Sequence, residues 1–206
     1  MPRLARENTL PSFQLALDAG ADGLELDVHT TADGVVVIHH DPDLPGGARI
    51  DALTLAELQR HEAVPGVHVP TLEELCALVD GRATLFVELK GNGVERAVLD
   101  VLAGYGGPVA LHSFDHAMIR RAAQVDPTRR LGILFEDPPV AVSARMAETG
   151  ALDVWPHWSL VTPALVTEVH GAGGRVIPWT VNDQATAQSL ASLGVDALCG
   201  DDVRIL

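Results

Sequence analysis

The stretch GLELDVH, residues 23–29, alternates apolar and polar side chains, as a half-buried strand does. Its polar positions include Glu25 and Asp27, so two carboxylates lie on one face of the predicted strand. Like charges this close repel one another unless an opposite charge neutralises them. A divalent cation that prefers oxygen ligands would do so. The stretch therefore predicts a strand and a candidate metal site together.

Strand-like runs and amphipathic helical segments alternate along the whole sequence, which predicts a parallel β/α fold. A first helix is expected from Thr9, a capping residue, through Leu17, with Gly20 as its stop. Parallel strands are expected at residues 23–28, 84–90, 108–114, 131–135, 152–157, 175–181 and 195–200. Helices are expected within residues 94–106, 116–125, 140–150, 162–174 and 182–194.

Seven parallel strands are one short of a closed TIM-type (β/α)8 barrel. The missing first strand is expected before the first helix, because the sequence begins in the loop that leads into that helix. A length of 206 residues with 47% hydrophobic content is enough for one domain, residues 1–206, with a substantial core.

The run VVVIHH, residues 35–40, is expected to return antiparallel to the strand at residues 23–28. Its connection, TTADG, is too short for a crossover helix, and Asp33-Gly34 is a hairpin signal. A turn centred on that dipeptide places His40 opposite Asp27, where a slip of one residue would turn the histidine to the other face. In the predicted register His40 is a candidate general acid or base, because an imidazole titrates near neutral pH.

A third carboxylate and a lysine lie at the end of another predicted strand. In TLFVELK, Glu88 and Lys90 share one face. The C-terminal strand ends of β/α barrels carry the active site, so Glu88 is expected near Glu25 and Asp27. Three carboxylates suit Mg²⁺ or Ca²⁺, although each one alone is more often a solvated or salt-bridged residue. Lys90, the only lysine of the chain, suits a phosphate oxygen.

Two aromatic residues also fall at predicted strand ends. Trp179 ends the strand RVIPWTV, and Phe114 ends PVALHSF. Either ring is expected to wall a substrate pocket or simply to pack, and the pattern favours neither.

Composition excludes several partners. A formal net charge of −14 argues against nucleic acid and against an anionic membrane surface. No apolar run approaches the roughly 18 residues of a membrane span, and no charged-then-apolar signal segment opens the sequence. The two cysteines have no metal-type spacing and are expected to be buried free thiols, which favours the cytoplasm.

With these residues in place, the sequence resembles the glycerophosphodiester phosphodiesterase family over essentially its whole length. The most specific stretches are residues 20–41 and the VELK of residues 87–90; the others are ENTLPSF, LTLAELQ, PTLEEL, HSF, WTVN and GVDALCGD. Members are (β/α)8 barrels that hydrolyse glycerophosphodiesters to glycerol 3-phosphate and an alcohol with Mg²⁺ or Ca²⁺. The resemblance implies a role in glycerol and lipid metabolism, with a small-molecule glycerophosphodiester as the substrate.

The resemblance also implies roles for individual residues. The metal ligands of the family match Glu25, Asp27 and Glu88, and one of its two catalytic histidines matches His40. Lys90 matches a phosphate-side lysine, and Trp179 matches an aromatic residue of the substrate pocket.

Two departures from the family pattern stand out. Members begin with a strand that ends in His-Arg-Gly shortly before ENT, and that histidine and arginine have no counterpart here. Residues 42–84 form a short insertion beside the larger one that many members carry. Because the larger insertion helps to recognise the glycerol side, substrate preference stays open.

Three interpretations follow. The first is an active phosphodiesterase whose start lies upstream of Met1. The second is a remnant that binds metal or phosphate without turnover, because it lacks the first catalytic histidine. The third is a lysophospholipase D-like activity on lipid headgroups, which the acidic composition and the absence of a basic amphipathic helix disfavour.

Overall fold

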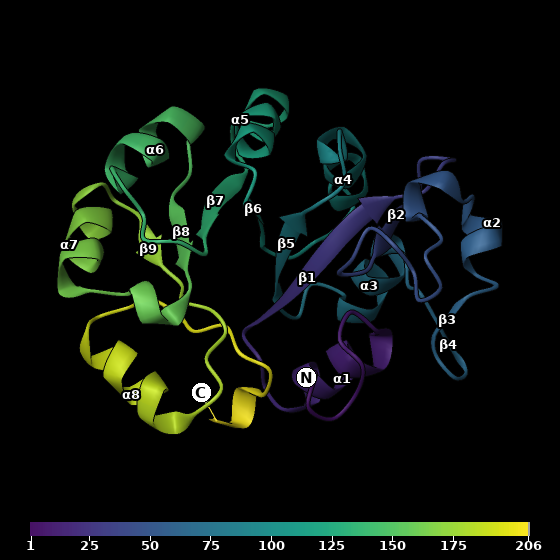
Figure 1. The fold of residues 1–206 in the computed structure, drawn as a ribbon, viewed down its shortest axis with the longest axis horizontal. Helices are drawn as coiled ribbons and strands as arrows, with labels where there is room; N and C mark the ends of the chain where they lie inside the picture. Colours follow the sequence, from purple (N-terminus) through teal and green to yellow (C-terminus); the bar gives the residue numbers. More distant parts are fainter. Residues whose placement is uncertain (206) are drawn as a thin grey trace. The chain divides into compact units, whose positions relative to one another are not determined.

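The computed structural model describes residues 1–205, which divide into two compact units (Figure 1). The first unit is Met1–Val109 and the second begins at Ala110. Each unit consists of strands with helices between them, so the predicted β/α character is present in both. That the chain forms a single domain stays a prediction.

In the first unit, β1 is the central strand, antiparallel to β2 on one side and parallel to β5 on the other (Figure 1). Its helices are α1 (Leu10–Asp18), α2 (Leu55–Leu58), α3 (Leu72–Val79) and α4 (Glu95–Leu102). Its strands are β1 (Gly23–Thr30), β2 (Val36–Ile38), β3 (Glu62–Val64), β4 (Val67–His68) and β5 (Thr84–Leu89), and Ile50–Ala52 is a 3₁₀ turn.

The first helix begins after Thr9 as predicted and ends at Asp18, one residue later than predicted. The Thr9 hydroxyl accepts a hydrogen bond from the Ser12 backbone N–H, which otherwise lacks a partner at the start of a helix. Gly20, two residues beyond the end of α1, has a φ of +85°, which costs a glycine little and other residues more. The chain then turns directly into β1, so the capping residues position the carboxylate strand.

The predicted register of the hairpin is wrong by one residue. The backbone N–H of Thr31 donates to the carbonyl of Val35, so the turn holds three residues, 32–34, instead of two. Val28 therefore pairs with Ile38, and the His39 N–H donates to the Asp27 carbonyl at 3.0 Å. His39 and not His40 lies opposite Asp27.

The loop after β2 packs its own small core. Val37, Leu44, Ile50, Leu58 and Val69 are all buried together. The segment at residues 42–84 is thus an ordered insertion with its own apolar contacts, which holds β2 and the residues after it in place.

In the second unit, four parallel strands follow one another in the order β6-β7-β8-β9. The strands are β6 (Val109–Ser113), β7 (Arg130–Phe135), β8 (Asp153–Pro156) and β9 (Arg175–Val176). The helices are α5 (His116–Val125), α6 (Val142–Thr149), α7 (Pro163–Gly171) and α8 (Gln184–Ser192), with 3₁₀ turns at Trp158–Leu160 and Val203–Ile205. Among the helices of residues 1–205, none combines the length and apolar character that crossing a bilayer requires.

The last two predicted strands are shorter and less regular than expected. β9 covers only two residues of the predicted 175–181, because Pro178 has no N–H for a ladder and the segment continues as an isolated bridge from Trp179 to His157. Residues 195–200 do not form a regular strand within the described chain. They run beside residues 176–181 through scattered backbone bonds, such as Cys199 N–H to the Pro178 carbonyl. Both cysteines, Cys76 and Cys199, are partly buried thiols.

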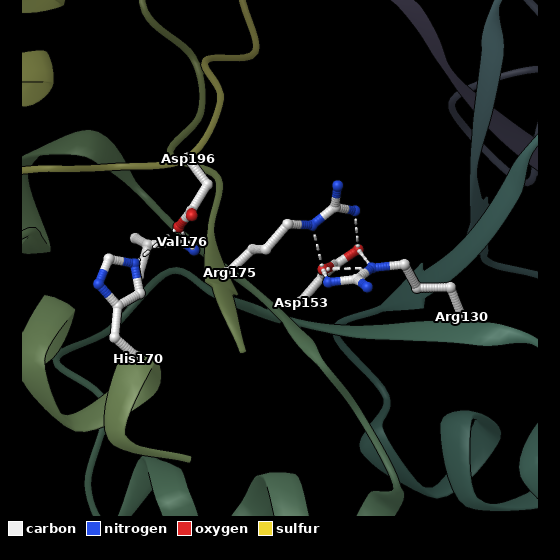
Figure 2. Close-up of polar contacts among 6 residues, drawn as sticks. All are labelled: Arg130, Asp153, His170, Arg175, Val176 and Asp196. Atoms are coloured by element: carbon white, nitrogen blue, oxygen red, sulfur yellow. Dashed lines mark hydrogen bonds and ion pairs between the residues drawn. The ribbon is translucent and has the colours of Figure 1, made fainter. Parts of the chain in front are cut away.

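The first residues of β7, β8 and β9 form a buried charge cluster (Figure 2). Asp153 has no exposed surface, and guanidinium groups of Arg130 and Arg175 clamp its carboxylate from two sides at 2.6–3.0 Å. These are the amino ends of the strands, which in β/α barrels contribute to stability, whereas the carboxyl ends carry the active site. Planar bidentate pairs of this kind tie the three strands together.

Replacing Asp153 with Asn is expected to lower the free energy of unfolding by about 3–5 kcal/mol, because two guanidinium groups then lose a shared buried anion. Thermal or denaturant unfolding measures the loss. Asp51→Asn removes an exposed bidentate pair with Arg49 and serves as the control, with no measurable change expected. Equal stability of the two variants would contradict the structural role of the cluster.

Candidate metal and phosphate site

The register of β1 and β5 brings acidic side chains together at the carboxyl ends of both strands. Asp27 is the register partner of Glu88, and Glu25 lies two residues earlier on the same face of β1. Carboxylate oxygens of Glu25 and Glu88 lie within 4.8 Å of each other. Asp27 and Glu88 are buried, and Glu25 is partly buried. The structure thus brings Glu25 and Glu88 together and pairs Asp27 with Glu88 across the two strands, and the role of all three as ligands of one cation stays a prediction.

Lys90 follows the last residue of β5 and turns toward the carboxylates. Its Nζ atom lies 3.3 Å from Asp27 Oδ1 and 3.7 Å from Glu88 Oε1. The lysine side chain is mostly covered, with 19% of its surface exposed, so its charge acts in a medium of reduced dielectric. The structure thus joins Lys90 to two of the three predicted metal ligands.

The electrostatics of this cluster are unfavourable to full ionisation. Burial, together with the charge of Asp27, raises the pKa of Glu88 to about 9. The same two causes raise the pKa of Glu25 well above its ordinary value, although Lys90 and His40 act in the opposite direction. Like-charged carboxylates that share a buried site behave in this way when no cation offsets them.

The donor set fits a hard divalent cation. The carboxylate oxygens of Glu25 and Glu88 lie close enough to approach one ion, and the repulsion between such groups is the feature that a cation would relieve. The raised pKa values of Glu25 and Glu88 agree with this geometry, because burial and a neighbouring negative charge are the conditions that a cation would offset.

His40 lies close enough to Glu25 to lower that residue's pKa, although the hairpin register differs from the prediction. Its ring Nδ1 is 2.8 Å from Asp41 Oδ1, and this contact lowers the pKa of Asp41. The His40 side chain is about half exposed, so a ligand from solvent can approach the ring. His39 instead turns its Nδ1 to the Asp41 carbonyl at 2.8 Å.

Reasoning from the sequence missed two residues of this site. Asp41 follows His40 directly and was assigned no role. Asn8 is bonded to Asp27 across 19 residues of chain, through two hydrogen bonds that no periodic pattern reveals. The available signal was an asparagine directly before the Thr9 cap. Asn adopts a left-handed backbone more readily than most residues, so a tight turn at Asn8 could have been expected.

In the second unit, Phe114 and Trp179 are in contact. Their rings pack edge to face with centroids 5.5 Å apart, and Trp179 Nε1 donates to the Trp155 carbonyl at 3.0 Å. The ring of His157 also packs edge to face on Trp179. Phe114 is 42% exposed, so this aromatic pair presents an apolar surface held in a fixed orientation.

Comparisons with known proteins agree on one class. Solved structures similar to nearly the whole chain include a phosphodiesterase from Oleispira antarctica in complex with the product sn-glycerol-3-phosphate, at 29% identity and a TM-score of 0.89, covering 95% of this chain and 87% of that one. Another is a putative glycerophosphodiester phosphodiesterase from Galdieria sulphuraria, at 25% identity and a TM-score of 0.89, covering 96% and 89%. The fold class is therefore α/β of the TIM-barrel type, as predicted, and the class of protein is a phosphodiester hydrolase.

The chain belongs to the glycerophosphoryl diester phosphodiesterase family, whose family model matches residues 1–205. Among curated relatives, a glycerophosphodiester phosphodiesterase from Caldanaerobacter subterraneus subsp. tengcongensis is 28% identical, covering 97% of this chain and 90% of the relative. A probable glycerophosphodiester phosphodiesterase 1 from Mycobacterium tuberculosis is 31% identical, covering 92% and 82%.

Replacing Glu88 with Gln is expected to stabilise the metal-free protein at alkaline pH. The folded-state pKa of Glu88 is raised to about 9 from an ordinary value of 4.5. Its contribution to stability is therefore complete below about pH 4.5 and is lost as the pH rises toward 9, whereas Gln stays neutral. In EDTA, the thermal unfolding midpoint of Glu88→Gln should exceed that of the parent by several degrees at pH 8 and by little at pH 4.5.

Glu136→Gln, at an exposed loop position, is the control and should show no such pH-dependent gap. A Glu88→Gln protein that is less stable than the parent at pH 8 would contradict the electrostatic account of the cluster.

Proposed function

We propose that the protein hydrolyses glycerophosphodiesters to glycerol 3-phosphate and an alcohol, with Mg²⁺ or Ca²⁺ as the cofactor. The observation that carries the proposal is the buried pairing of Asp27 and Glu88 with Lys90, next to Glu25, in a chain of this family. The reaction adds water across one phosphorus–oxygen bond: the oxygen of water joins phosphorus, and a proton leaves with the alcohol.

Glu25, Asp27 and Glu88 would hold the cation. When bound, a divalent cation stabilises the negative charge that develops on the phosphate oxygens during displacement. Held by raised-pKa carboxylates, it would also displace protons from Glu25 and Glu88, so cation affinity should weaken as the pH falls.

Lys90 contributes a positive charge that does not depend on the cation. Its ammonium group already bridges Asp27 and Glu88, and an ammonium is a compact partner for one phosphate oxygen. We assign it to the phosphate of the substrate, where it neutralises charge in a largely covered site.

His40 is the proposed general acid or base. The contact between its Nδ1 and Asp41 favours the tautomer with the proton on Nδ1, which leaves Nε2 free to exchange a proton with a reacting oxygen. Asp41 would orient the ring and stabilise the imidazolium, as carboxylates do beside other catalytic histidines.

The remaining assignments concern the substrate's alcohol and the location of the protein. Trp179 and Phe114 are proposed to contact the substrate through the faces of their fixed rings. Two cysteines that remain thiols are typical of a reducing compartment such as the cytoplasm. The acidic net charge of −14 supports a small-molecule substrate over nucleic acid.

The function is tested with purified protein and glycerophosphocholine or glycerophosphoethanolamine, with Mg²⁺ or Ca²⁺ added after chelation. Release of glycerol 3-phosphate, followed by phosphorus NMR, is expected with cation and not with EDTA. Cation binding without turnover would instead support a non-catalytic remnant. Turnover confined to lysophospholipids would support the lysophospholipase D-like alternative.

Two adjacent histidines allow a direct test of the acid or base. His40→Ala is expected to lower kcat by about 10²–10⁴-fold, the usual worth of a positioned acid or base, with cation affinity retained. His39→Ala is the matched variant, because His39 lies opposite Asp27 in the hairpin yet turns its ring nitrogen to a backbone carbonyl. A large loss in His39→Ala together with an active His40→Ala would reverse the assignment.

A further inference from the structure

Asn8 holds the Asp27 carboxylate through a two-point clamp. Its Nδ2 donates to Asp27 Oδ2 at 2.7 Å, and its Oδ1 accepts from the Asp27 backbone N–H at 3.2 Å. The two bonds require opposite ends of the amide, so the N–H end has to face the carboxylate. Lys90 takes the other oxygen, Oδ1, at 3.3 Å. Each carboxylate oxygen of Asp27 therefore has a partner in the protein: Asn8 for Oδ2 and Lys90 for Oδ1.

We propose that Asn8 is a positioning residue that presets the Asp27 carboxylate for its divalent cation. The inference rests on the proposed function, because it takes Asp27 as a metal ligand. Carboxylate ligands are commonly oriented by hydrogen bonds from neighbouring residues, and loss of such a neighbour typically costs 10- to 100-fold in metal affinity.

The backbone conformation at Asn8 helps to direct its side chain toward β1. Asn8 has a φ of +56°, in the left-handed region that Asn and Gly tolerate best. The next residue, Thr9, caps α1, so a single turn both begins the helix and aims the Asn8 amide at β1. Local conformation is thus coupled to the geometry of the site.

The chain contains the same device a second time. In the second unit, Asn182 donates to Asp201 Oδ2 at 2.7 Å and accepts from the Asp201 N–H at 3.0 Å. Nineteen residues separate the partners in both clamps. Each clamp spans a helix of nine residues whose capping side chain, Thr9 or Asp183, follows the asparagine directly.

The second clamp, between Asn182 and Asp201, makes it possible to test whether Asn8 acts on the fold or on cation binding. Asp27 belongs to the carboxylate cluster with Glu88 and Lys90, whereas Asp201 belongs to none of the ion pairs found among residues 1–205. If the clamp only joins a helix to the segment after it, breaking either copy should have the same effect on cation binding. If Asn8 positions a ligand, only the first copy should change cation binding.

The experiment compares the parent protein with Asn8→Gly and Asn182→Ala. Glycine suits the left-handed backbone at position 8, so Asn8→Gly removes the amide without adding strain. Titration calorimetry with Mg²⁺ or Ca²⁺ alone is expected to show 10- to 100-fold weaker binding for Asn8→Gly and binding within twofold of the parent for Asn182→Ala. Hydrolysis by Asn8→Gly should recover toward the parent kcat at saturating Mg²⁺.

Other outcomes overturn the inference in distinguishable ways. A parent that binds neither cation overturns the proposed function and the inference with it. A parent that binds while Asn8→Gly binds equally well overturns the role of Asn8 alone, and so does an equal loss in Asn182→Ala. If Asn8→Gly does not fold, Asn8→Ser replaces it. A single hydroxyl cannot bridge both groups, so the same weakening is expected.

Discussion

Repulsion between carboxylates on two neighbouring parallel strands is the constraint around which the first unit is arranged. Asp27 and Glu88 are register partners in β1 and β5, and both are buried. A pairing of this kind works against folding, because burial and mutual charge raise the cost of ionising each group. The pKa values of Glu25 and Glu88 are raised for this reason, by burial first and by the charge of Asp27 second. Such an unfavourable arrangement is typical of functional sites, where a bound ligand can offset the repulsion.

The second unit contains a buried carboxylate with the opposite character. Asp153 is completely covered, but two guanidinium groups satisfy it, and it lies where strands begin. Asp27 and Glu88 lie where strands end and share a single ammonium contact from Lys90. This difference follows the general rule for β/α barrels, in which residues at the amino ends of the strands stabilise the fold and residues at the carboxyl ends carry out the chemistry.

The groups around Asp27 show how a proposed metal-binding carboxylate can be held in one orientation while its oxygens can still accept a cation. Lys90 approaches one oxygen and Asn8 the other, and each carboxylate oxygen has lone pairs enough for a further partner. The clamp at Asn182 and Asp201 indicates that the asparagine bridge is a general way for this chain to join a helix to the segment after it. In the first unit that bridge lies next to Glu88 and Lys90, where orientation has chemical consequences.

Local patterns in the sequence determined strands β1, β5, β6, β7 and β8, the caps and the carboxylate face. Alternation with a period of two is enough to put Glu25 and Asp27 on one side of β1, and the Thr9 cap and Gly20 stop act within a few residues of themselves. The tertiary structure alone decided the hairpin register, in which one extra turn residue replaced His40 by His39 opposite Asp27. It also decided the Asn8 clamp and the arginine pair on Asp153, which join residues about twenty positions apart. The physical reason is that such contacts depend on how elements pack, and a periodic pattern records only which face of an element is covered.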